Sequence, residues 1–122
     1  MASYRSVTVY CSSSNVIRPI FTDAAEQLGA EFARCHIQLV NGGGSVGLMG
    51  VMARAVHDKG GRVVGVIPKR LKSIEGRAYE ASDELILTET MRERKRIMYE
   101  RSDAYVALAG GLLTNSTHSS ET

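Results

Sequence analysis

The sequence predicts an α/β protein: a three-layer α/β/α domain built around a mainly parallel sheet. Short, almost continuously apolar runs alternate with longer segments in which apolar residues recur every three or four positions. Strands that are apolar on both sides are typical of a parallel sheet with helices on both faces, and the alternation is typical of β-α-β units. Glycine-rich turns follow two of the apolar runs.

The first three predicted strands are the apolar runs at residues 6–11, 37–40 and 63–67. Two segments with helical periodicity lie between them. Pro19 suits the first turn of the first helix, and Gly60-Gly61 suits the end of the second. The apolar stripes of these helices are Phe21, Ala25, Leu28 and Phe32, and then Leu48, Val51, Met52, Ala55 and Val56.

The second half of the chain adds two strands and one helix to this pattern. Residues 69–83 predict a polar connector, and residues 85–87 predict a short fourth strand. A capping box at Thr90 begins a helix that extends to about Arg101. Residues 105–108 predict a fifth strand, which ends in the second glycine-rich turn.

Gly42, Gly43 and Gly44 lie in the predicted turn between the second strand and the second helix. Glycines allow close approach and positive φ, so their backbone N–H groups could converge on a phosphate next to a helix N-terminus. The alternative is a tight connection that needs glycine only for its geometry. Ser13, after the first strand, is a further candidate for this cradle, with the alternative of a turn former or helix cap.

Arg94 and Lys95 are unusual because they point toward, or border, the apolar side of their helix. That side is marked by Met91 and Met98. Burial of an unpaired cation is costly, so the pattern implies an anionic ligand or a partner. For Arg94, the alternatives are an ordinary salt bridge and an aliphatic stem that carries the charge to solvent.

The composition is that of an ordinary globular domain. The 122 residues are 43% hydrophobic and 23% charged, with a net charge of +2. So small a charge predicts no general binding of nucleic acid, and no apolar run is long enough to span a membrane. The two cysteines lack metal-ligand spacing and the start of the chain lacks a signal peptide, so we expect a cytoplasmic protein.

Several short segments occur together in one order: CSSS, GGGSVGLMG, GGRVVGVIPKRL, Glu75, MRERK and SDAYVALAGG. With this order and spacing, residues 7–111 resemble the LOG ("lonely guy") family of cytokinin riboside 5′-monophosphate phosphoribohydrolases, once labelled lysine decarboxylases. The resemblance implies a Rossmann-like fold and a homodimer or higher homo-oligomer. It also implies hydrolysis of a nucleoside 5′-monophosphate to free base and ribose 5-phosphate, with no metal and no cofactor.

The resemblance also implies roles for individual residues. Arg94 and Lys95 match the family's MxxRK motif, which implies substrate binding by both residues and a catalytic role for Arg94. Glu75 matches a carboxylate that contacts the substrate. Three more residues match the PGGxGTxxE motif, whose loop and helix start hold the phosphate: Gly110, Gly111 and Thr114.

The chain departs from the family within that last motif. Ala109 stands in place of the proline, Leu113 in place of the third glycine, and Thr117 in place of the catalytic glutamate. Cleavage of an N-glycosidic bond builds positive charge on the ribose, and threonine offers no carboxylate to stabilise it. We therefore expect low or absent turnover. We also expect an incomplete domain over residues 1–111, followed by a divergent or truncated polar tail at residues 112–122.

Two other functions are alternatives to hydrolysis. A non-catalytic nucleotide-binding or dimerisation module would keep the glycine run, Arg94 and Lys95 without the chemistry. Rossmann-like proteins that carry molybdenum cofactor provide a fold-level analogy for such a binder. Lysine decarboxylation is the weaker alternative, because the sequence has no recognisable context for a pyridoxal-phosphate lysine.

Overall fold

A computed structural model describes residues 5–11, 19–109 and 112–116, which form one six-stranded sheet and four helices. The strands are β1 (Arg5–Cys11), β2 (Ile37–Asn41), β3 (Val63–Pro68), β4 (Glu84–Thr88), β5 (Ala104–Ala109) and β6 (Leu112–Ser116). The helices are α1 (Pro19–Arg34), α2 (Gly47–Asp58), α3 (Lys69–Lys72) and α4 (Met91–Glu100).

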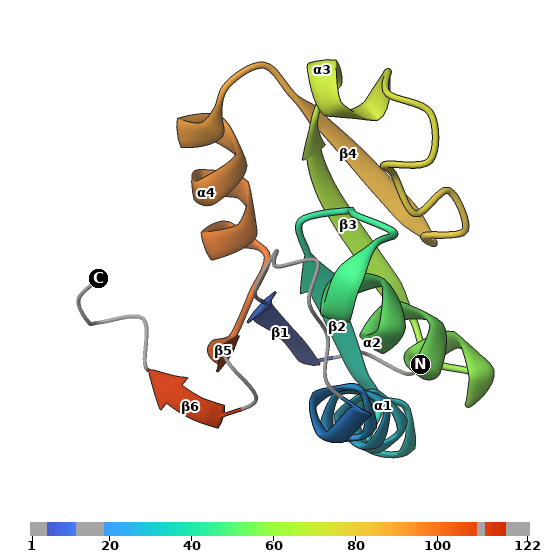
Figure 1. Cartoon of the computed structure of the whole chain (residues 1–122). Helices are drawn as coiled ribbons and strands as arrows, with labels where there is room; N and C mark the ends of the chain where they lie inside the picture. The colour runs from blue at the N-terminus through green and yellow to red at the C-terminus, as the bar shows by residue number, and fades with distance from the viewer. Residues whose placement is uncertain (1–4, 12–18, 110–111, 117–122) are drawn as a thin grey trace.

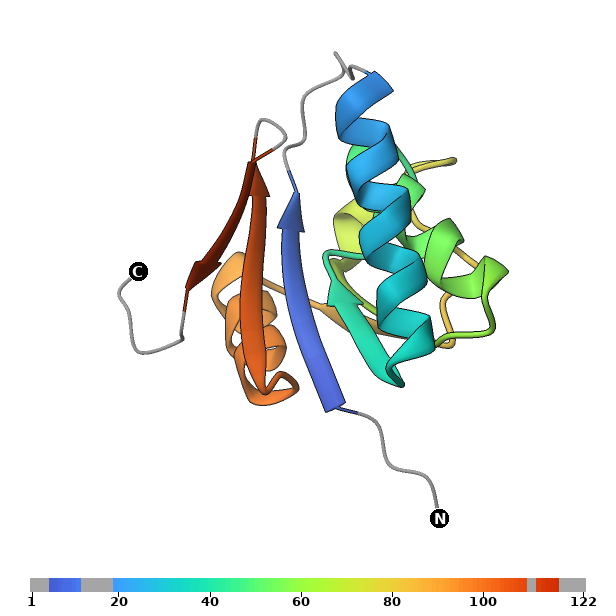
Figure 2. The ribbon, with the colours of Figure 1, turned by 90° about the horizontal axis from the view of Figure 1, so that it is seen from below.

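The sheet has the strand order β4-β3-β2-β1-β5-β6, and its first five strands are parallel. Helices α1 and α2 cover one face, while α4 lies on the other, which gives the three layers (Figure 1, Figure 2). Because the five strands are parallel, their carboxyl ends meet at one edge of the sheet. Ligands of open α/β proteins gather at such an edge.

Each face of the sheet has its own apolar core. On one face, buried Phe32 of α1 and Met52 of α2 pack in a cluster with Leu39 of β2. On the other face, Met98 of α4 packs in a cluster with Val64 of β3. Strands that contact helices on both faces must be apolar on both sides, which explains their almost continuous apolar sequence.

The five parallel strands and the three longer helices confirm the predicted α/β class, with strand bounds that differ by one residue. The first half of the capping box is confirmed, because Thr90 Oγ1 accepts a hydrogen bond from the Glu93 N–H at 3.1 Å. The Glu93 side chain, however, accepts from the N–H of Glu89 at 2.7 Å. Gly60 follows the end of α2 with φ of +81° and donates its N–H to the His57 carbonyl at 3.0 Å. This is the conformation for which glycine is favoured at a helix end.

The structure differs from the sequence prediction in the connector after β3. The segment begins with α3, a single helical turn that follows Pro68 directly. A turn this short leaves no periodic pattern of apolar residues, so the polar sequence alone did not indicate it. Within the described residues, no helix is long and apolar enough to cross a membrane.

The second difference lies after β5. Residues 112–116 form β6, which pairs antiparallel with β5 in a register that places Thr114 opposite Ala107. The resemblance implied the start of a helix at Thr114, and this backbone is a strand instead. In the sequence, two apolar residues and a β-branched one follow Gly110-Gly111, a pattern that is typical of a β-hairpin. The division into a domain and a separate tail stays a prediction.

Candidate functional site

The candidate site begins at Arg94, which α4 carries to the carboxyl edge of the sheet. Its Nε atom donates a hydrogen bond to the Val66 carbonyl of β3 at 2.9 Å. Its Nη2 atom donates to the Gly42 carbonyl at 2.6 Å. Burial lowers the pKa of Arg94 below its ordinary value, while the nearby phenol of Tyr10 acts in the opposite direction.

The charge of Arg94 is not balanced by an acid in the part of the chain that the structure describes, where Arg94 takes part in no ion pair. The predicted alternative of an ordinary salt bridge is therefore absent there. Two carbonyl dipoles hold the guanidinium, and its Nη1 atom faces the weak acceptor Sδ of Met91 at 3.7 Å. A half-buried guanidinium in this state can still accept an anion.

Gly42 is the glycine that allows Arg94 to reach this position. A Cβ atom at residue 42 would collide with Nη2 and would also crowd Cζ of Arg94 at 3.1 Å. Gly43 has a different requirement, because its φ is +80° and a Cβ atom there would lie 2.9 Å from Cβ of Ile67. The glycine run and Arg94, which the sequence indicated separately, thus form one packed unit.

The backbone amides of the glycine loop already have hydrogen-bond partners. The Gly43 N–H donates to Asn41 Oδ1 at 2.8 Å, and the Gly44 N–H approaches Met49 Sδ at 3.2 Å. The Ser45 N–H donates to the Arg77 carbonyl at 2.9 Å. These contacts favour the geometric interpretation of the glycines, and a phosphate cradle at residues 42–44 stays a prediction.

Asn41 is a site residue that the sequence reasoning missed. It is 2% exposed at the end of β2, where Oδ1 fixes the turn and Nδ2 has no hydrogen-bond partner among the described residues. Thr88, at the end of β4, is also buried, and its Oγ1 atom likewise has no hydrogen-bond partner among the described residues. A polar residue that ends an apolar strand was the available signal for both.

The remaining predicted site residues are more scattered. Lys95 is exposed on α4, and Glu75 is exposed in the connector next to Gly76. The Gly76 carbonyl accepts a hydrogen bond from Ser45 Oγ at 2.5 Å, so the backbone beside Glu75 contacts the end of the glycine loop. Thr114 lies in β6. Three predicted positions lie outside the described residues: Ser13, Gly110 and Gly111.

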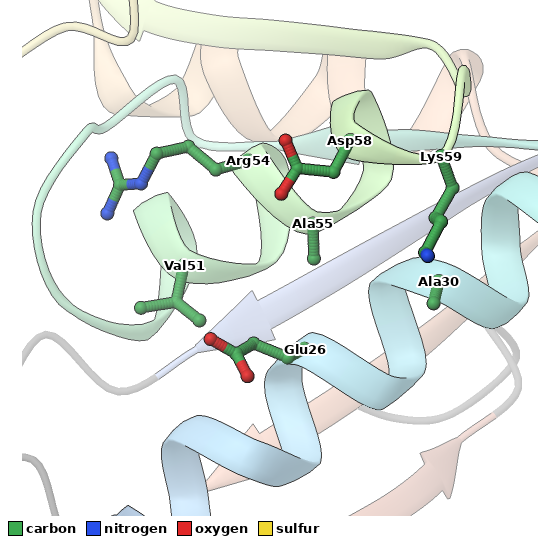
Figure 3. A pocket seen from close by; sticks show the side chains of 7 residues that line it. All are labelled: Glu26, Ala30, Val51, Arg54, Ala55, Asp58 and Lys59. Atoms are coloured by element: carbon green, nitrogen blue, oxygen red, sulfur yellow. The ribbon is translucent and has the colours of Figure 1, made fainter.

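A separate hollow lies between α1 and α2, on the face of the sheet opposite α4 (Figure 3). Its volume is about 530 Å³, and none of the predicted site residues lines it. Acidic and basic side chains both border it, so it offers no charge of one sign to a ligand. The lining residues are Glu26, Ala30, Val51, Arg54, Ala55, Asp58 and Lys59.

Comparison of the whole sequence with known proteins gives consistent matches. A family model described as "Possible lysine decarboxylase" matches residues 49–115. The cytokinin riboside 5′-monophosphate phosphoribohydrolase LOG5 of Arabidopsis thaliana is 44% identical over 110 residues, which cover 88% of this chain and 47% of LOG5. The probable phosphoribohydrolase LOGL9 of Oryza sativa subsp. japonica is 47% identical over 110 residues, with the same two coverages. The chain spans about half the length of these curated relatives.

Solved structures support the same fold. The molybdenum cofactor binding protein of Rippkaea orientalis superposes with a TM-score of 0.73 at 24% identity, over 92% of this chain and 66% of that protein. The molybdenum cofactor carrier protein of Chlamydomonas reinhardtii gives a TM-score of 0.71 at 24% identity, over 86% and 62%. At this identity the likeness shows the Rossmann-like fold alone. The family match and the similar relatives together show that the chain belongs to the family described as "Possible lysine decarboxylase", the family of the LOG proteins.

Proposed function

We propose that the chain binds nucleoside 5′-monophosphates and comes from a lineage of enzymes that hydrolyse the N-glycosidic bond of these nucleotides. The proposed substrate class is cytokinin nucleotides or AMP. The observation that carries the proposal is the Arg94 guanidinium, half-buried at the carboxyl edge of the sheet without an acidic partner among the described residues. A substrate phosphate would supply the missing negative charge. The names of the curated relatives support cytokinin riboside 5′-monophosphates as members of this class.

In the proposed reaction, the oxygen of a water molecule bonds to C1′ of the ribose while the bond from C1′ to the base breaks. The base leaves with the electron pair of that bond and takes up a proton, and the second product is ribose 5-phosphate. Arg94 would hold the phosphate and so fix the ribose at the edge of the sheet. Lys95 and Glu75 are the further substrate contacts in this proposal, and neither a metal nor a cofactor is required.

A non-catalytic nucleotide binder is the second candidate. Thr117 in place of the family glutamate favours it, as does a strand where the resemblance implied the start of a helix. Both candidates need Arg94, and only hydrolysis needs a carboxylate beside the ribose. We further propose that the protein is cytoplasmic and does not bind membranes and, from the resemblance, that it acts as a homodimer or higher homo-oligomer.

Base release distinguishes the two candidates. The protein is incubated with AMP or with isopentenyladenosine 5′-monophosphate, and free base and ribose 5-phosphate are separated and quantified. The same assay is run on a variant with Thr117→Glu and Leu113→Gly. We expect nucleotide binding with little or no base release from the unmodified chain and more release from the variant. Rapid release by the unmodified chain would show that Thr117 is not disabling.

A further inference from the structure

Three side chains meet below the glycine loop, near the start of β3. His57 lies in the last turn of α2, and Tyr79 and Asp83 lie in the connector before β4. The Nδ1 atom of His57 is 2.7 Å from Tyr79 Oη, and its Nε2 atom is 2.8 Å from Asp83 Oδ2. The rings of His57 and Tyr79 also stack, with centroids 5.5 Å apart.

The hydrogen-bond partners of His57 indicate which of its two nitrogens carries the proton in the neutral ring. Burial raises the pKa of Asp83, but hydrogen bonds from His57 and from the Val63 N–H outweigh it, so the pKa lies below its ordinary value. An ionised carboxylate only accepts, so Nε2 of His57 carries the proton that it donates to Asp83. In the neutral imidazole, Nδ1 then accepts from the Tyr79 hydroxyl.

Tyr79 connects this cluster to the glycine loop through its backbone. Its N–H donates to the Gly43 carbonyl at 2.8 Å, while the Ser45 N–H donates to the Arg77 carbonyl at 2.9 Å. Gly44 and Ala78 form an antiparallel bridge between these two hydrogen bonds. The connector therefore pairs with the loop at one isolated antiparallel bridge, and the phenol of Tyr79 anchors this part of the connector to α2.

We propose that His57, Tyr79 and Asp83 form a brace that positions the glycine loop and, through the Gly42 carbonyl, the guanidinium of Arg94. The brace fixes the connector on one side of the loop. On the other side, Arg94 Nη2 donates its 2.6 Å hydrogen bond to the Gly42 carbonyl. Loss of the brace would free the loop and shift the donor that meets the phosphate. The link from Arg94 to a phosphate rests on the proposed function, whereas the brace itself does not.

Tyr79→Phe is the sharpest test, because it removes one hydroxyl and keeps the ring that stacks on His57. Tyr99→Phe makes the same chemical change on α4 and is the matched control. Amide hydrogen exchange at Ser45 and the NMR exchange rate of the Arg94 Nε–H report on the loop and the guanidinium. The ¹⁵N shifts of His57 report its tautomer, a signature that a general loss of stability would not change.

With Tyr79→Phe we expect about fivefold faster exchange at Ser45 and at Arg94 Nε–H, the effect of one lost hydrogen bond. Tyr99→Phe leaves both rates unchanged. The unmodified protein should show His57 with its proton on Nε2. Equal exchange rates in the two variants, or a proton on Nδ1 in neutral His57, would overturn the brace.

Nucleotide affinity then tests whether the brace serves the site. We expect Tyr79→Phe to raise the Kd for AMP about fivefold, and His57→Ala combined with it to add little, because both changes remove one unit. If Tyr79→Phe made exchange at Ser45 faster but changed neither exchange at Arg94 nor the Kd for AMP, the proposed link from the brace to Arg94 would be overturned. Failure of the unmodified protein to bind AMP would contradict the proposed function. The exchange rate of the Arg94 Nε–H would then still show whether the brace positions Arg94.

Discussion

The Nη2 atom of Arg94 donates a 2.6 Å hydrogen bond to the Gly42 carbonyl, across 52 positions in the sequence. The same nitrogen occupies the space that a side chain at residue 42 would need. This hydrogen bond links the glycine turn that precedes α2 to the candidate catalytic cation on α4, at the carboxyl edge of the sheet. This link explains why a glycine is required directly after β2, independently of any ligand.

Gly42→Ala should displace the Arg94 guanidinium, because the new Cβ atom would collide with Nη2. We expect a loss of stability of about 1–3 kcal/mol, typical of an overpacked site, and weaker AMP binding. Gly44→Ala is the control, since its nearest neighbour is the flexible Met49 Sδ at 3.2 Å. Urea unfolding and calorimetry measure both effects. A Gly42→Ala protein that binds AMP as tightly as the unmodified chain would contradict this packing.

Asn41→Ala should destabilise the turn after β2. The Gly43 N–H would lose its acceptor at 2.8 Å in a buried place, which costs about 1–3 kcal/mol. Urea unfolding measures the change, with Gln38→Ala as a second buried polar position in the same strand. If nucleotide binding falls only in Asn41→Ala, the turn and not the strand is responsible. Unchanged stability in Asn41→Ala would show that the turn does not depend on this side chain.

Glu84 and Arg101 form a two-point ion pair, with an oxygen–nitrogen distance of 2.6 Å at the closer contact. The hydrogen bond from Arg101 lowers the pKa of Glu84 from 4.5, and partial burial opposes it. A carboxyl group whose pKa is lower in the folded state stabilises the fold at pH values above its unfolded-state pKa. This stabilisation is lost as the pH falls through the folded-state pKa. Glu84→Gln should therefore cost up to about 1 kcal/mol at neutral pH. The difference should begin to shrink in urea titrations as the pH falls below 4.5, and it should vanish only below the lowered folded-state pKa.

Tyr105 should limit the stability of the protein in alkali. Burial, with smaller contributions from Tyr10 and Tyr99, raises the pKa of Tyr105 from 10.0 to about 12. The fold favours the neutral phenol. The stabilisation that the raised pKa of Tyr105 gives to the fold is therefore complete below pH 10 and is lost as the pH rises through about 12. Tyr105→Phe should unfold at a higher pH than the unmodified protein. Circular dichroism during an alkaline titration measures this, and coincident transitions in both proteins would contradict it.

Much of the fold could be predicted from local sequence, and the internal organisation of the site could not. Continuous apolar runs identify the five parallel strands. The predicted inner stripe of α4 is only half right, because Met98 is buried and Met91 is exposed, but Arg94 does reach the Val66 carbonyl of the sheet. The carbonyl partners of Arg94 come from distant segments and leave no mark near residue 94. The pairing of residues 43–45 with 77–79 is equally non-local, so those polar residues looked like an ordinary connector.

In the proposed function Arg94 provides the anion site, and calorimetric titration with AMP measures its contribution. Arg94→Met removes the half-buried cation and keeps a side chain of similar length, while Arg92→Met removes an exposed cation two residues earlier in α4. We expect Arg94→Met to weaken AMP binding about tenfold to a hundredfold, the effect of lost charge-assisted hydrogen bonds. Arg92→Met should bind like the unmodified protein. Equal affinity of the two variants for AMP would show that Arg94 does not provide the anion site.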